Sequence, residues 1–212
     1  MKDVNNIEAI IFDLDGTIYN KKWLKLFFSL SYIFNLSILL SYLKIRKQNI
    51  GIDCKTKDKF NVRIIEDLSK RTSMSHEKCK IFIENFMQNF ISILEKKYKP
   101  NNNIIEVINY YHNKGVKIIC LSDYSMAKER LLALNIDITK FTLIKSSEDY
   151  GALKPAKTPF IKIAEELNID VSKIIVVGDR DDTDGEGARR CNMEFVKYPE
   201  QFNILTKHII DE

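Results

Sequence analysis

The chain has 212 residues, 45% of them hydrophobic and 29% charged, a composition typical of a domain that can bury a sizeable core. Its net charge is only +4, and its lysines are dispersed without interleaved aromatics, so the composition gives no case for nucleic-acid binding. The four cysteines are far apart, and the first residues lack the apolar run of a signal peptide. We therefore expect free thiols and a cytoplasmic location.

The first predicted element is a buried strand over Ala9–Phe12, followed directly by the run Asp13–Thr17, D-L-D-G-T. Two carboxylates thus emerge two positions apart at the carboxyl end of a strand, where open α/β sheets bind their ligands. Such a pair can hold a hard cation or share nucleophilic and acid–base duties. A solvated acidic turn would have the same sequence, so the rest of the chain must decide.

Residues 19–99 predict a helical insert after this strand, because a simple strand-helix-strand unit needs only about 30 residues. Apolar residues at helical spacing predict one helix around Phe60–Leu68 and a longer one over Cys79–Leu94, with Ser75 as its N-cap. The insert contains no convincing strand. We expect it to form a lid over the carboxyl ends of the strands.

The segment Leu26–Leu43 carries no charged residue and is flanked by lysines. Its length reaches the lower limit for a membrane-spanning helix, about 17 residues. One crossing would place Asp13 and Ser122 on opposite sides of the bilayer, so that no common sheet could form. We therefore expect a helix or helical pair buried in the lid. A homodimer surface and a dock for a hydrophobic substrate or a membrane face are the alternatives.

From residue 102 onward, helical and strand patterns alternate, which predicts βαβ units and an α/β fold with a parallel sheet between helices. The predicted helices are 104–111, 125–134 and 158–167, and the predicted strands are 116–121, 141–144, 173–177 and 194–196. The predicted organisation is a core of residues 1–18 and 100–212, with the all-helical insert at 19–99.

Three further polar signals follow predicted strands. Ser122 ends the second strand, where its hydroxyl can bind an anion or cap the next helix. Lys154 follows the third strand and can neutralise phosphate as a compact cation. The loop 178–185 after the fourth strand carries Asp179 and Asp184 among four acids, a crowding that is costly unless cations offset it. Beside Asp13, this loop predicts a Mg²⁺ site.

In this order the four signals resemble the motifs of the haloacid dehalogenase superfamily, chiefly its Mg²⁺-dependent phosphatases. The insert lies where that superfamily carries its C1 cap. The motif matches are Asp13 to Thr17 for the first, Ser122 for the second, Lys154-Pro155 for the third, and Gly178-Asp179 with Asp184 for the fourth.

The resemblance implies a Rossmann-like core with a helical cap and a phosphomonoester hydrolase acting on a small phosphorylated metabolite. Asp13 is then the nucleophile that forms an aspartyl-phosphate, and Asp15 is the acid–base residue, oriented by Thr17. The implied ligands of Mg²⁺ are Asp13, Asp15 through its carbonyl group, Asp179 and Asp184. The implied phosphate-binding residues are Thr17, Ser122, Asp123 and Lys154.

Two departures from the family pattern concern Asp123, where many relatives have Asn, and Lys157, where a second proline is common. Substrate contacts are expected nearest the nucleophile in sequence, at Tyr19, Asn20, Lys21 and Trp23. The alternative functions are a membrane-peripheral phosphatase for a hydrophobic ester, a phosphomutase and a non-enzymatic binding protein.

Overall fold

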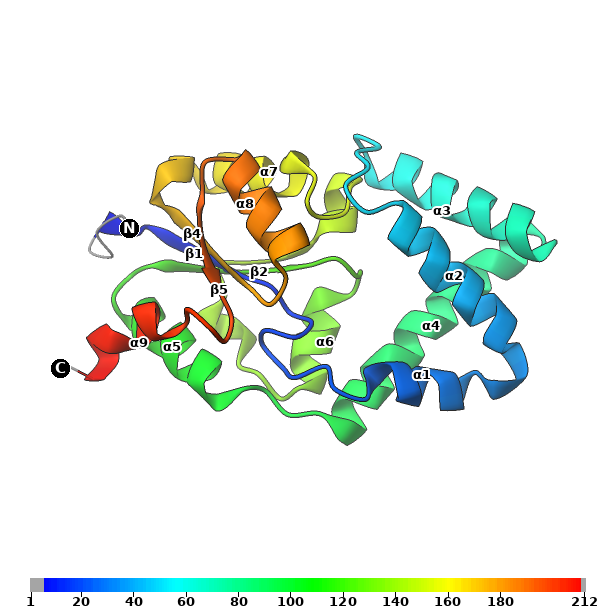
Figure 1. The fold of residues 1–212 in the computed structure, drawn as a ribbon, viewed down its shortest axis with the longest axis horizontal. Helices are drawn as coiled ribbons and strands as arrows, with labels where there is room; N and C mark the ends of the chain where they lie inside the picture. Colours follow the sequence, from blue (N-terminus) through cyan, green and yellow to red (C-terminus); the bar gives the residue numbers. More distant parts are fainter. Residues whose placement is uncertain (1–5, 211–212) are drawn as a thin grey trace.

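The core is a five-stranded parallel sheet in the order β3-β2-β1-β4-β5, in a computed structural model that describes residues 6–210 (Figure 1). Its strands are β1 (Ala9–Phe12), β2 (Lys117–Ser122), β3 (Leu143–Ser146), β4 (Ile174–Gly178) and β5 (Glu194–Lys197). All neighbouring strands pair in parallel, which confirms the predicted sheet. The carboxyl ends of β1, β2 and β4 therefore meet at one edge.

Helices cover both faces of this sheet. Strand β1 alternates between them: Ile10 and Phe12 belong to one hydrophobic cluster and Ala9 and Ile11 to the other. On the first face lie α5 (Asn102–Asn113), α6 (Ala127–Ala133) and α9 (Asn203–Ile210), and on the second lie α7 (Lys157–Leu167) and α8 (Glu186–Arg190) (Figure 1). Strands buried on both faces read as continuous apolar runs, which is why they were predictable.

Short helical turns precede or follow several strands and shift their limits. They are η3 (Ile138–Lys140), η4 (Ser147–Tyr150), η5 (Val171–Lys173) and η6 (Asp181–Gly185). The strand predicted from residue 141 begins at Leu143, because Phe141 still closes η3, with its amide bonded to the carbonyl of Ile138. The helix predicted from residue 125 begins at Ala127, because Met126 adopts a left-handed conformation with φ 55°.

The insert is helical, as expected, and the fold is a Rossmann-like α/β core with an inserted all-helical cap. Its elements are α1 (Leu24–Ser31), η2 (Ile33–Asn35), α2 (Leu36–Gln48), α3 (Lys57–Thr72) and α4 (His76–Lys97). Ser75 caps α4 by accepting a hydrogen bond from the amide of Lys78. Tyr19 pairs with Pro100 where the chain leaves and re-enters the core. The exact domain limits stay a prediction, and residues 1–5 and 211–212 of the predicted core lie outside the described residues.

Aromatic side chains join the cap to the core. Phe86 and Phe90 of α4 are fully buried, and both rings lie against Phe28 of α1. On their other side they contact Tyr124, which follows β2 in the core, with ring centroids 5.5 Å apart for Phe90. One hydrophobic cluster therefore runs from the sheet through α4 into the cap.

The apolar segment 26–43 forms a helical pair, but the expectation that it is buried is wrong for much of its length. Phe28 and Leu39 are buried, whereas Phe34 is 97% exposed. Two helices joined by a sharp bend can turn only one side toward α4, so the other side stays exposed. Within residues 6–210 no single helix is long and apolar enough to span a membrane. The segments Leu24–Ser31 and Ile33–Gln48 pass that test as a pair, bent by 81°.

Candidate active site

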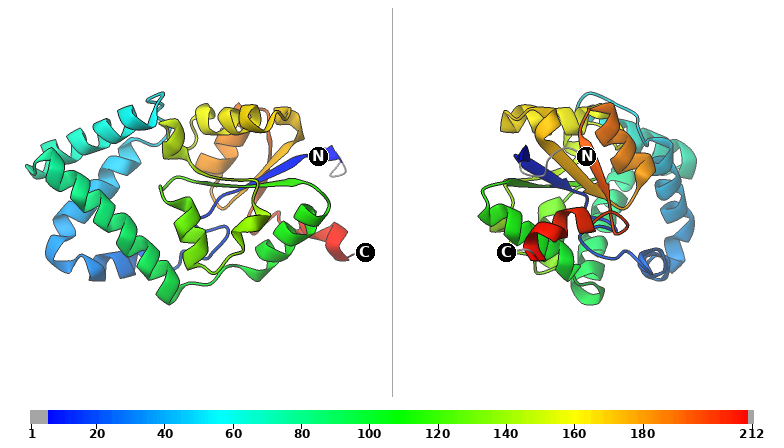
Figure 2. Two further views of the ribbon diagram at one scale, coloured as in Figure 1. Left: turned by 180° about the vertical axis from the view of Figure 1, so that it is seen from behind. Right: turned by 60° about the vertical axis from the view of Figure 1, so that its left-hand side comes forward.

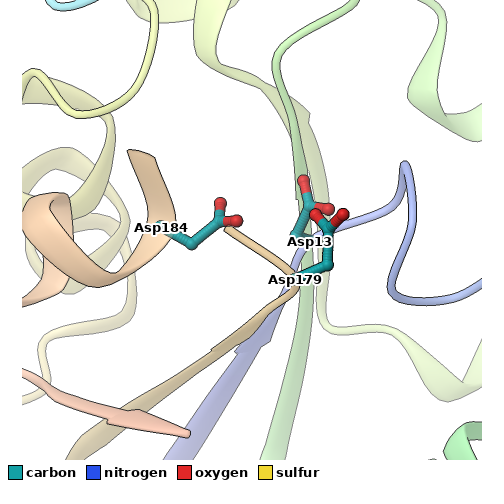
Figure 3. A group of neighbouring side chains, drawn as sticks. All are labelled: Asp13, Asp179 and Asp184. Carbon is teal, nitrogen blue, oxygen red and sulfur yellow. The ribbon is translucent and has the colours of Figure 1, made fainter. Parts of the chain in front are cut away.

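Three carboxylates from separate motifs converge at the carboxyl edge of the sheet (Figure 3). Asp13 follows β1, Asp179 follows β4 and Asp184 lies in η6, and one carboxylate oxygen of each lies within 4.8 Å of the other two. We call these residues the carboxylate cluster. Asp184 approaches over Gly178, where a Cβ atom would lie 2.5 Å from its side chain. Glycine at the end of β4 therefore makes the cluster possible.

Lys154 neutralises part of this cluster from the loop before α7. Its Nζ donates to Asp13 Oδ1 and to Asp184 Oδ1, each at 2.6 Å, and it is 2% exposed. Burial would lower the pKa of Lys154, but the two carboxylates raise it well above its usual value. Its backbone amide donates to Asp123 Oδ1 at 3.0 Å, so Asp123 fixes the loop that carries Lys154.

The electrostatics at Asp13 favour a further positive charge. Burial raises the pKa of Asp13 to about 8; Lys154 opposes this, while Asp184, Asp15 and Asp179 add to it. A nucleophilic carboxylate must be ionised, and a cation among these oxygens would favour that form. Carboxylate oxygens are the ligands that Mg²⁺ takes in proteins. The residues of the carboxylate cluster therefore fit Mg²⁺.

Asp15 is held apart from the cluster by three donors. Ser122 Oγ donates to its Oδ2 at 3.0 Å, and the Tyr19 hydroxyl and the Arg130 guanidinium donate to its Oδ1. Burial would raise the pKa of Asp15, but Arg130, and with it Tyr19 and Ser122, lowers it. Asp15 is therefore ionised at neutral pH in this arrangement.

Thr17 does not orient Asp15 as expected. Its buried hydroxyl donates to Asp13 Oδ2 at 3.2 Å instead. The reason lies in the turn between them: Gly16 has φ 104°, and the chain folds back so that the amide of Ile18 bonds the carbonyl of Leu14. Thr17 thereby faces Asp13, while Asp15 points toward Ser122 at the end of β2.

Of the four expected substrate contacts, two lie at the carboxylates. Tyr19 is fully buried against Asp15, and Lys21 Nζ lies 2.5 Å from Asp179 Oδ2 and 2.8 Å from the carbonyl oxygen of Asp15. Asn20 accepts a hydrogen bond from the amide of Lys22, and Trp23 is 61% exposed. A substrate role for these residues stays a prediction.

Two buried arginines that contact the site, Arg130 and Arg46, were not identified from the sequence. Arg130 lies over the ring of Phe90 at 4.2 Å, and Arg46 lies over the ring of Tyr124 at 4.0 Å while pairing with Glu148. Helical spacing could have revealed Arg130, which shares the buried face of α6 with Leu131. An arginine at such a position is normally taken to be exposed.

The site thus offers a buried carboxylate contacted by a lysine, a cluster of carboxylates that fits a cation, and a separate second acid. The chain matches the family model of haloacid dehalogenase-like hydrolases over residues 7–192. It therefore belongs to this family of hydrolases.

Three individual proteins that resemble the chain share less than 30% of its sequence in the matched region. A phosphoglycolate phosphatase from Aquifex aeolicus is 28% identical over 53% of this chain and 56% of its own length, so the match spans about half of that relative. A 2-haloacid dehalogenase from Pseudomonas syringae has the same fold, with a TM-score of 0.63 at 15% identity over 91% of this chain and 86% of its own. A β-phosphoglucomutase from Clostridium difficile also has this fold, with a TM-score of 0.60 at 23% identity over 93% of this chain and 87% of its own.

Proposed function

We propose that this chain is a Mg²⁺-dependent phosphomonoester hydrolase that acts on a small phosphorylated metabolite through an aspartyl-phosphate at Asp13. The observation that carries the proposal is the carboxylate cluster with Lys154 bonded to both Asp13 and Asp184. Such a site suits phosphoryl transfer, in which positive charge and positioning do most of the catalytic work. The phosphatase among the relatives supports the same reaction class.

The residues divide the reaction into two displacements. In the first, an Asp13 oxygen attacks phosphorus, the bond to the alcohol oxygen breaks, and Asp15 gives that oxygen a proton. In the second, water attacks the aspartyl-phosphate, Asp15 takes its proton, and phosphate leaves Asp13. Because Arg130 favours ionised Asp15, the first proton transfer requires Asp15 to turn away from Arg130 and take up a proton from solvent in the substrate complex.

The charges around Asp13 explain how phosphate oxygens are received. Lys154, in the loop before α7, and the Ser122 hydroxyl, at the end of β2, can stabilise oxygens that gain charge. Mg²⁺ held by Asp13, Asp179, Asp184 and the Asp15 carbonyl would supply charge between nucleophile and phosphate. Asp123, inferred from the sequence as a phosphate contact, supports this function through its hydrogen bond to the amide of Lys154.

Asp15 favours phosphatase over dehalogenase chemistry, because dehalogenation on this fold does not need the second acid. A phosphomutase keeps the same residues but returns phosphate to a sugar hydroxyl, so product analysis separates it from a hydrolase. A hydrophobic phosphate ester stays an alternative substrate class, which a panel of phosphorylated metabolites and lipid-linked phosphates would reveal.

The test is hydrolysis of an aryl phosphate such as p-nitrophenyl phosphate. Asp13→Asn should abolish turnover while its thermal unfolding stays cooperative. Chelation of Mg²⁺ should stop hydrolysis by the wild-type protein. Asp181→Asn is the matched control, because Asp181 lies in the same acidic loop but pairs with Arg189 at the surface. Near-normal turnover by Asp13→Asn would refute the proposal, as would an equal loss in both variants.

A further inference from the structure

The bend between α1 and α2 exposes a group of large apolar side chains that nothing in the described residues covers. We call this group the cap tip; it comprises Leu30, Ile33, Phe34, Leu36 and Leu40, and their exposed fractions run from 37% for Leu36 to 97% for Phe34. In both Figure 1 and Figure 2 this bend lies at the end of the molecule opposite the sheet. Scattered apolar residues are ordinary on a surface, but a group of this kind marks a contact site.

The charged residues that flank the cap tip in the sequence are all basic. No Asp or Glu occurs between Asp15 and Asp53. The exposed lysines Lys22 and Lys25 precede the tip, and the exposed Lys44 and Lys47 follow it. A groove of about 230 Å³ between α1 and α4 is lined by Phe27 and Leu30 and by Lys96 and Lys97. The apolar surface is therefore bordered by basic residues on α1, α2 and α4.

The spacing on α2 separates the apolar and basic parts along the helix. Leu36, Leu40 and Lys44 follow one another at four-residue intervals and share the exposed side. At a rise of about 1.5 Å per residue, the lysine lies about 12 Å from the first leucine. Interfacial helices bury their apolar side about 5–10 Å into the boundary between lipid headgroups and acyl chains. Inserted to that depth, the tip would reach the acyl chains with its lysines at the headgroups.

A second copy of this chain fits the surface poorly. A two-fold contact places each patch against itself, so the lysines of both copies would face one another with no carboxylate from this segment between them. An anionic bilayer provides what a second copy lacks, because it attracts each nearby lysine. We propose that the cap tip docks on the surface of an anionic phospholipid bilayer. This goes beyond the proposed reaction, whose residues lie in the core.

The first test is co-sedimentation with phosphatidylcholine vesicles that contain phosphatidylserine. Wild type should pellet with them, and the double variant Ile33→Ser/Phe34→Ser should bind more weakly by about tenfold or more. Val62→Ser is the matched control, because Val62 is 55% exposed on α3 of the same cap. These side chains are exposed, so both variants should keep the wild-type circular dichroism and aryl-phosphatase activity.

The second test separates lipid charge from simple hydrophobic contact. Lys44→Gln/Lys47→Gln should weaken binding to the anionic vesicles by about tenfold. Wild type should bind vesicles of phosphatidylcholine alone far less. The proposal is overturned if wild type fails to pellet, if Val62→Ser loses as much binding as the tip variant, or if both vesicle types bind equally. It is also overturned if light scattering shows a dimer that Ile33→Ser/Phe34→Ser dissociates.

Discussion

Among single residues, Lys21 bears directly on the proposed cation site. Its ammonium group contacts the Asp179 carboxylate and the Asp15 carbonyl oxygen, both expected ligands of Mg²⁺. A bound cation must therefore displace Lys21. Replacing Lys21 by Met should tighten Mg²⁺ binding by about fivefold, since a partly exposed ion pair contributes about 1 kcal/mol. Isothermal titration calorimetry measures this change without any substrate.

The adjacent lysine provides the control. Lys22 is exposed, and its ammonium group lies over the ring of Trp23 at 5.5 Å. Lys22→Met therefore removes the same charge next in sequence while leaving the carboxylate cluster untouched, and its Mg²⁺ affinity should equal that of wild type. Unchanged or weaker Mg²⁺ binding by Lys21→Met would show that Lys21 and the cation do not compete.

At the scale of elements, the sequence allowed prediction of the parts that position the motifs. Strands β1, β2 and β4 are apolar on both faces, and polar motifs begin where each one ends, so Asp13, Ser122 and Asp179 could be brought to one edge. The partner of Asp15 could not be predicted. The pairing of Asp15 with Arg130 depends on how α6 packs against β2, which residue spacing along the chain does not encode.

The cap was predicted less well than the core for a physical reason. An apolar run such as Leu26–Leu43 indicates that something must cover it, but not which side turns inward. The bend at η2 decided that: Phe28 and Leu39 face the cap interior, and Phe34 faces outward.

Gly151, at the end of η4, gives a prediction about how the elements of cap and core fit together. It has φ 72°, and a Cβ atom there would lie 2.4 Å from the backbone of Thr56, the N-cap of α3. Gly151→Ala should lower the free energy of unfolding by more than about 2 kcal/mol, from the left-handed conformation plus the overlap. Urea unfolding measures this value.

Gly115, which follows α5, isolates the backbone contribution. Its φ is 82°, but nothing among the described residues lies within 4 Å of a Cβ atom placed there. Gly115→Ala should therefore lower the free energy of unfolding by about 1 kcal/mol from conformation alone. Equal losses in the two variants would mean that close packing against Thr56 adds nothing at Gly151.

Considered as a whole, the molecule has a second contact between cap and core at the segment just before Lys154, beside the aromatic contacts of α4. The ion pairs Arg46–Glu148 and Lys57–Asp149 both end on η4. The amide of Cys54 also bonds the carbonyl of Gly151 at 2.8 Å. Because this segment leads directly into the loop of Lys154, we expect movement of the cap to act on the site through it.

Arg46 connects cap position to the site most directly. Its Nη2 donates to the carbonyl of Asp123 at 2.7 Å, and the Asp123 side chain holds the amide of Lys154. Arg46→Leu leaves buried Glu148 without its cation, so the free energy of unfolding should fall by about 3–5 kcal/mol.

The double variant Arg46→Leu/Glu148→Leu removes both charges and should recover part of that stability, because replacing a buried ion pair by apolar residues is often neutral. In the single variant hydrogen exchange should speed up most at α2, which locates the loss at the junction of cap and core. A double variant as unstable as the single one would show that the loss comes from the contacts of Arg46 with Asp123 and Tyr124 rather than from an unpaired Glu148.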